Sequence, residues 1–299
     1  MHPFWKIPLL ALTLLASAAV SAAGKLPVVA SFSILGDLVS AIGGERVAVS
    51  TLVGPGQDAH MFEPSPADAK KVAQAKLVVV NGLGFDPWLN RLSGAAGYKG
   101  ETVLASSGIK ARQMPDEDHP GKIQIDPHAW QDPSNVITYV GNIAAALGKI
   151  DPAGARYYQD NRDRYVKSLK ELDDWAGQQF AQIPAAKRKV ITSHDAFGYL
   201  GARYRITFLA PQGISTESEA SARDVAKLIR QIKRERIKAV FVENMSNPQL
   251  LQQISSEAGV AMGAKLYADA LSDPQGAAPT YLRMMRYNVE QLMRGLKLN

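Results

Sequence analysis

The sequence predicts an α/β fold in which two parallel-sheet lobes are joined by a single long, rigid helix. Short β-branched runs alternate with helical periodicity before residue 150 and again after residue 185, which is typical of parallel sheets covered by helices. Between them, residues 151–184 show no strand pattern and keep one apolar stripe at helical spacing. About 30 helical residues would span roughly 45 Å, enough to connect two lobes.

The first lobe is predicted to begin the alternation with three strands and four helices. The strands are expected at 26–32, 45–53 and 76–82, and the helices at 34–44, 65–75, 86–92 and 134–150. The helix at 65–75 has a strong start signal, because Ser65 can cap it, Pro66 takes its first position and Asp68 completes a capping box.

The second lobe is predicted to resume the same alternation after the long helix. Its strands are expected at 187–193, 205–210, 237–244 and 260–269, and its helices at 195–204, 221–235, 247–259 and 280–297. The domain organisation follows: an N-terminal lobe at 24–150, a linking helix at 151–184 and a C-terminal lobe at 185–299.

Residues 1–23 are predicted to be a signal peptide. They combine a lysine, a short apolar run and a tail of small residues, and the run is too short for a comfortable membrane span. A lipid anchor would need a cysteine at the cleavage site, and the chain has none. We therefore expect a periplasmic protein that is secreted and not lipidated.

Composition narrows the classes of function. The formal net charge of +6 comes without a dense Lys/Arg tract interleaved with aromatic residues, so nucleic-acid binding is not expected. The absence of cysteine removes disulfides and thiolate ligands, so a metal site would have to use His, Asp or Glu side chains.

Three histidines and one aspartate fall in connections next to predicted strand ends. His60 and His194 follow strands, His128 precedes the helix at 134–150, and Asp269 ends the strand at 260–269. Ligands of open α/β sheets gather beyond the carboxyl ends of the strands, so these side chains can converge. Each also has an ordinary structural explanation as a loop, capping or turn residue, and position alone leaves both interpretations open.

Five stretches resemble the zinc- and manganese-binding solute-binding proteins of bacterial ABC importers. They are SFSILGDLV (31–39), DAHMFEPSPADA (58–69), DPHAWQDPSN (126–135), TSHDAFGYL (192–200) and the run from 217 to 272. The resemblance implies a metal site in the cleft between the lobes, with His60 and His128 from the first lobe and His194 and Asp269 from the second. It implies metal import with a membrane permease as partner, no catalysis, and a monomeric protein.

Zn²⁺ is the expected cargo. Three imidazoles and a carboxylate saturate a tetrahedral zinc site, whereas a catalytic zinc keeps an open position. Members of the family with glutamate in place of His194 resemble manganese or iron binders, but some with histidine also take manganese, so manganese or iron is the alternative. An exported zinc-dependent hydrolase is the alternative from another class, and no His-Glu-x-x-His or Gly-x-Ser-x-Gly motif supports it.

Residues around the site have further candidate roles. Asp58 and Glu63 could orient His60, or could be solvated surface groups. His119 lies in a short acidic loop at 114–124, where dedicated zinc binders of the family often carry a long histidine-rich loop, and a role in capturing metal stays open. Delivery to the permease is expected to begin with the second-lobe ligands, His194 or Asp269.

Overall fold

The computed structural model describes residues 24–115, 121–216 and 220–299. The predicted signal peptide and His119 lie outside these residues. Within the described part of the chain, no helix combines the length and apolar character needed to cross a bilayer.

The first lobe is built on a parallel sheet in the order β2-β1-β3-β4. Its strands are β1 (Leu26–Phe32), β2 (Val47–Val53), β3 (Leu77–Val80) and β4 (Glu101–Leu104). All four residues of β3, LVVV, are buried, as expected for an interior strand covered on both faces. Its helices are α1 (Ser33–Gly43), α2 (Pro66–Gln74), α3 (Pro87–Ala95) and α4 (Pro133–Ile150). The predicted capping box at Ser65 and Asp68 is present at the start of α2.

The second lobe has a shorter and less regular parallel sheet. Strands β7 (Lys189–Ile191) and β8 (Thr207–Leu209) pair in parallel. The strands expected at 237–244 and 260–269 appear as isolated parallel bridges, Ile191↔Val240 and Glu243↔Leu266, which correct that prediction. The backbone hydrogen bonds are present but are not consecutive enough to form strands. The helices are α6 (Gly198–Tyr204), α7 (Ala222–Glu235), α8 (Gln249–Ala258) and α9 (Tyr281–Leu296).

An antiparallel hairpin that the sequence did not predict leads into His128. It consists of β5 (Arg112–Pro115) and β6 (Ile123–Asp126). Ile123 and Ile125 on β6 are exposed, so the hairpin lacks the buried apolar face that makes a strand recognisable from sequence. Tyr199 of α6 fixes it in place, accepting a hydrogen bond from Arg112 N–H and donating one to the carbonyl of Asp126.

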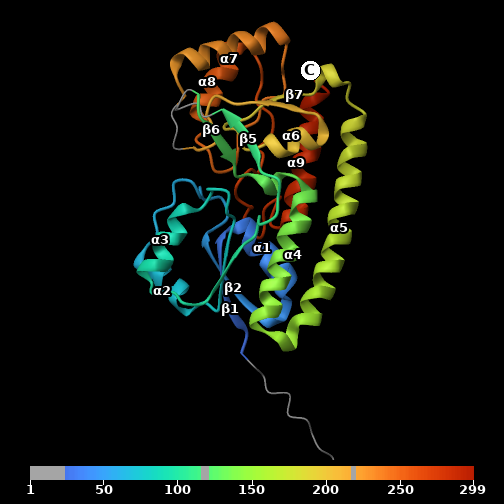
Figure 1. Cartoon of the computed structure of the whole chain (residues 1–299). Helices are drawn as coiled ribbons and strands as arrows, with labels where there is room; N and C mark the ends of the chain where they lie inside the picture. Colours follow the sequence, from blue (N-terminus) through green and yellow to red (C-terminus); the bar gives the residue numbers. More distant parts are fainter. Residues whose placement is uncertain (1–23, 116–120, 217–219) are drawn as a thin grey trace, which may run out of the picture.

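The long helix α5 (Ala155–Ala181) runs beside both lobes (Figure 1). Its 27 residues correspond to a length of about 40 Å. It packs against α4, α1 and α9 through a stripe that includes Tyr158, Leu169, Leu172 and Phe180. The predicted connecting helix is confirmed as the element that runs along both lobes.

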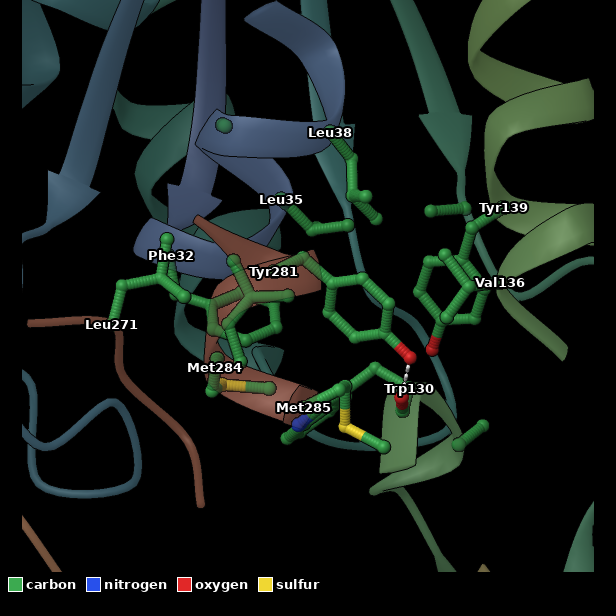
Figure 2. Packing of buried hydrophobic residues seen from close by; sticks show 14 of the residues in the cluster. Phe32, Leu35, Leu38, Trp130, Val136, Tyr139, Leu271, Tyr281, Met284 and Met285 are labelled. Atoms are coloured by element: carbon green, nitrogen blue, oxygen red, sulfur yellow. Dashed lines mark hydrogen bonds between the residues drawn. The ribbon is translucent and has the colours of Figure 1, made fainter. Parts of the chain in front are cut away.

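The last helix, α9, completes a core that begins with the first strand. Figure 2 shows Tyr281, Met284 and Met285 of α9 packed near Phe32 and Trp130, and the Tyr281 hydroxyl donates a hydrogen bond to the carbonyl of Trp130 at 2.8 Å. This shared core fixes the spacing of the strand ends that carry the candidate site.

The start of α9 is tied directly to α1. Tyr281 N–H donates to Asp37 Oδ2 at 2.8 Å, and just upstream Leu271 N–H donates to Ser33 Oγ at 3.0 Å. These two contacts join segments more than 230 residues apart in the sequence.

Candidate metal centre

The structure brings the four predicted residues together between the lobes. His60 lies in the irregular segment between β2 and α2, His128 follows β6, His194 follows β7, and Asp269 follows the bridge residue Leu266. One donor atom from each of the four side chains lies within 4.8 Å of all the others. The strand-end argument therefore identified positions that do converge.

The distances among the donor atoms are short and similar. His60 Nε2 lies 3.4 Å from His128 Nε2 and 3.4 Å from Asp269 Oδ2. His194 Nε2 lies 3.1 Å from Asp269 Oδ2, and His128 Nε2 lies 3.7 Å from Asp269 Oδ1. Four donors thus surround one point from both lobes.

Three of the four side chains are completely buried. His128, His194 and Asp269 have no exposed area, and the side chain of His60 is 7% exposed. Among the described residues, neither oxygen of Asp269 nor Nε2 of His194 has a hydrogen-bond partner. Buried polar atoms left without partners cost free energy, and a bound cation would satisfy them.

The charges of the cluster shift two pKa values in opposite directions. Burial would lower the pKa of His194, but the negative charges of Glu243 and Asp269 outweigh burial and hold it well above its ordinary value. Burial would raise the pKa of Asp269, but the neighbouring His194 and His128 hold it well below its ordinary value. The site therefore favours a positive charge at its centre.

Two carboxylates behind the histidines were missed by the sequence reasoning. Asp126 Oδ1 lies 2.9 Å from His128 Nδ1, and Glu243 Oε2 contacts His194 Nδ1. A carboxylate on Nδ1 fixes the tautomer and turns the Nε2 lone pair toward the centre, an arrangement common in metal sites. A sequence signal existed for both: Asp126 lies two residues before His128, and Glu243 lies near the end of the predicted strand 237–244.

Asp58 acts on the backbone of His60 and not on its ring. Asp58 Oδ1 accepts a hydrogen bond from His60 N–H at 2.9 Å, and its Oδ2 accepts one from Thr216 Oγ1 at 2.7 Å. The loop is fixed further by Trp88 Nε1, which donates to the carbonyl of Ala59 at 3.2 Å. Glu63 is exposed on the wall of a neighbouring cavity. The suggestion that Asp58 orients His60 is thus realised through the main chain.

Two α/β lobes on a long helix, with buried imidazoles and a carboxylate converging between them, define a binding protein built to enclose a small cation. The family model for the zinc-uptake complex component A, periplasmic, matches residues 28–295, so the chain belongs to this family.

Relatives and solved structures agree with this membership. The chain is 35% identical over 271 residues to the manganese-binding lipoprotein MntA of Halalkalibacterium halodurans, covering 91% of this chain and 88% of that protein. It is 31% identical over 282 residues to the manganese ABC transporter substrate-binding lipoprotein PsaA of Streptococcus pneumoniae, covering 92% and 90%. Its fold matches the periplasmic zinc binding protein TroA from Treponema pallidum with a TM-score of 0.85 at 27% identity, covering 91% and 99%.

The comparisons confirm part of the functional prediction. The chain is the metal-binding component of an ABC importer and not an enzyme: its family is a component of a zinc-uptake complex, and relatives that include PsaA are named as metal ABC transporter substrate-binding proteins. Its partners are therefore a divalent metal ion and a membrane permease.

The predicted localisation is contradicted. We expected a periplasmic, secreted protein that is not lipidated, but relatives from Halalkalibacterium halodurans, Streptococcus mutans, Streptococcus pneumoniae and Lactococcus lactis are all named as lipoproteins. The prediction rested on the predicted signal peptide and on the missing cysteine, and the names of these relatives contradict it.

Proposed function

We propose that the chain binds Zn²⁺ through His60, His128, His194 and Asp269 and passes it to the permease, acting as a monomer. The observation that carries the proposal is the spacing of the donor atoms, from 3.1 to 3.7 Å along four contacts. Ligands 2.0–2.2 Å from a tetrahedral ion lie roughly 3.3–3.6 Å from one another. The four contacts lie close to these separations, and one donor atom from each of the four side chains lies within 4.8 Å of all the others.

The donor chemistry supports zinc. Neutral imidazole is a favoured zinc ligand, and one carboxylate offsets part of the charge of the ion. The carboxylates of Asp126 and Glu243 behind two of the rings add negative charge and make the imidazoles better donors. Four protein ligands leave no open position for a reacting water, which suits a cargo site.

Manganese is the second candidate, and the relatives favour it. MntA and PsaA are both named as manganese proteins. A site made of nitrogen and oxygen ligands binds Zn²⁺ more tightly than Mn²⁺ in a direct comparison, so affinity alone does not identify the cargo in the cell. The test of the cargo therefore also has to measure which ion the protein carries when it is isolated from cells.

The ligand assignment is tested by titrating Zn²⁺ into metal-stripped protein in a calorimeter, with alanine at each of the four positions in turn. Each replacement is expected to weaken zinc binding by about a hundredfold or more, because the site loses one of four bonds. Glu257→Ala, at an exposed position at the end of α8, is the control and should leave the affinity within about twofold of wild type. Unchanged affinity in His60→Ala or His194→Ala would show that the assignment is wrong.

The identity of the cargo is tested separately. Protein purified from cells grown without added metal is analysed for zinc and manganese, and the loaded protein is then challenged with the other ion. Zinc in the isolated protein that a large excess of Mn²⁺ does not displace supports the proposal. Manganese in the isolated protein, with transport of Mn²⁺ lost on deletion of the gene, would replace zinc by manganese as cargo.

A further inference from the structure

The four proposed ligands are unequally exposed. The His60 side chain keeps 7% of its area in contact with solvent, whereas His128, His194 and Asp269 keep none. An ion at the centre is therefore enclosed by protein on the sides of those three residues. The His60 side is the thinnest part of the enclosure.

The imidazole rings are also unequally held. Asp126 faces Nδ1 of His128, and Glu243 faces Nδ1 of His194. Among the described residues, no group hydrogen-bonds Nδ1 of His60, whose ring meets Phe85 edge-on with the ring centroids 4.8 Å apart. Within the described part of the chain, rotation of the His60 ring breaks no hydrogen bond at Nδ1.

A large cavity lies on the same side. Its volume is about 800 Å³ and its wall includes His60, Phe62, Phe85, Trp88, Ile125 and Ile214. Three smaller cavities of about 490, 420 and 390 Å³ have none of the four proposed ligands in their walls. The large cavity therefore connects solvent with the exposed edge of the site.

We propose that the metal ion enters and leaves through this cavity, with the His60 ring as the ligand that moves aside. The proposal rests on the proposed function and adds a route to it. It replaces the expectation that His194 or Asp269 opens first, since both are fully buried and Glu243 holds the ring of His194.

The backbone under His60 is fixed, so the movement belongs to the side chain. Gly56 N–H donates to the carbonyl of Leu271 at 3.0 Å, and Asp58 holds His60 N–H at 2.9 Å. Rotation about the side-chain bonds of His60 opens one coordination position while the loop stays in place. A ring that is only 7% exposed turns more slowly than an exposed side chain, and we expect its rotation on the microsecond-to-millisecond timescale.

The route is tested by narrowing the cavity without touching a ligand. Ile125 is 46% exposed and lies on the cavity wall. Ile123 lies two residues earlier on the same face of β6 and is 68% exposed, but it is not part of that wall. Ile125→Trp is the test variant and Ile123→Trp is its matched control. Met61→Trp, at a residue that is also exposed and on the wall, is a second test variant.

Stopped-flow mixing measures Zn²⁺ association with the stripped protein, and dissociation from the loaded protein into an excess of chelating dye. Ile125→Trp and Met61→Trp are expected to slow both rates by the same factor, about threefold or more, because a narrower route changes rates and not the equilibrium. Ile123→Trp should match wild type. Unchanged rates in both test variants, or a changed dissociation constant with an unchanged association rate, would overturn the route.

The mobile ring is tested by NMR on protein labelled with ¹⁵N-histidine, with His60→Ala used to assign its signals. In the metal-free protein we expect exchange broadening at the His60 ring and sharp signals from His128 and His194. A rigid His60 ring, or broadening confined to His194, would overturn the proposal. Failure of the wild type to bind Zn²⁺ at all would overturn the function and the route together, whereas the outcomes above overturn the route alone.

Discussion

Glu243 lies directly behind His194: its buried carboxylate contacts Nδ1 on one edge of the imidazole, and Nε2 on the opposite edge lies 3.1 Å from Asp269 Oδ2. The other oxygen of Glu243 accepts hydrogen bonds from the backbone N–H groups of Ser193 and His194, at 2.9 and 3.1 Å. The whole residue at position 194 is therefore held by one side chain from 49 residues further along the chain.

Replacement of Glu243 by glutamine should weaken zinc binding by roughly 10–100-fold, because the ring loses the charge that fixes its tautomer and strengthens its donor atom. Calorimetry with Zn²⁺ on the metal-stripped variant measures the change. Glu257→Gln, at an exposed position at the end of α8, is the control and should bind as wild type. Wild-type affinity in Glu243→Gln would show that the carboxylate does not act on the metal through His194.

The residue at position 194 should decide whether the site prefers zinc or manganese. In the double variant His194→Glu with Glu243→Gln, an oxygen ligand replaces an imidazole and the carboxylate that would repel it is removed. The ratio of Mn²⁺ to Zn²⁺ affinity should rise by about tenfold or more over that of Glu243→Gln alone, since oxygen ligands suit Mn²⁺ better. Competition between the two ions, read by metal analysis after gel filtration, measures the ratio. An unchanged ratio would assign selectivity to other residues.

Asp58 should matter for affinity although it does not touch the ring of His60. Its two oxygens join His60 N–H to the Thr216 hydroxyl. Asp58→Ala should weaken zinc binding by about tenfold, because the loop that positions His60 loses the hydrogen bond that joins it to Thr216 of the second lobe. Glu63→Ala removes a carboxylate from the same loop and should change the affinity by less than about twofold. Equal effects of the two replacements would point to loop charge as the cause.

Asp37 should make the stability of the protein depend on pH. Burial raises the pKa of Asp37 to about 6, against the hydrogen bond from Tyr281 N–H, while the ordinary value is 3.8. The folded protein binds this proton more tightly than the unfolded chain, so the free energy of unfolding falls as pH rises from about 4 to about 6. Allowing for partial exposure, the loss is roughly 1–2 kcal/mol.

Asp37→Asn tests this dependence, because the amide oxygen can still accept from Tyr281 and no longer ionises. Urea unfolding of the metal-stripped protein at pH 4.5 and pH 7.5 should show a gain in stability for the variant at the higher pH and a flatter profile between them. Asp160→Asn, at an exposed position on α5, is the control. Parallel pH profiles for wild type and Asp37→Asn would contradict the assignment.

Asn299 should stabilise the second lobe. Its Oδ1 accepts from the N–H groups of Lys238 and Ala239 at 2.6 and 3.1 Å, and its Nδ2 donates to the carbonyls of Lys187 and Lys189 at 2.8 and 2.7 Å. Asn299→Ala should lower the free energy of unfolding by about 1–3 kcal/mol, measured by urea denaturation. Leu298→Ala, at a residue that is 63% exposed, should change it by under about 0.5 kcal/mol. Equal stability of the two variants would show that these bonds are replaced by water without loss.

The regular parts of the fold were predictable because local chemistry specifies them. Ser65, Pro66 and Asp68 start α2 as their capping pattern predicts. A strand was predicted at 237–244, where the structure has two isolated bridges, at Val240 and Glu243. The apolar pattern reports burial and does not report how many consecutive backbone pairs form. The lobe boundaries at 150 and 185 and the monomeric state stay predictions.

The four candidate ligands could be predicted from the sequence, but the contacts that hold them in place could not. Position next to predicted strands made His60, His128, His194 and Asp269 candidates, and the family resemblance implied them as a set, which the structure brings together. Only His60 and His194 follow strands of a parallel sheet, since His128 follows the antiparallel strand β6 and Asp269 follows an isolated bridge. Glu243 lies behind His194 through a sheet pairing that joins distant segments, and no spacing in the sequence encodes that pairing. Asp58 was a candidate from its position, but its action through the backbone depended on Thr216, 158 residues away.

The return of α9 to α1 has a consequence for the order in which the chain folds. Tyr281, Met284 and Met285 complete a core that includes Phe32, near the N-terminal end of the described chain (Figure 2). Almost the entire chain therefore has to leave the ribosome before α1 can form its contacts with α9. We expect the nascent N-terminal half to remain incompletely packed until the last helix emerges, so that the chain does not reach a stable fold during synthesis.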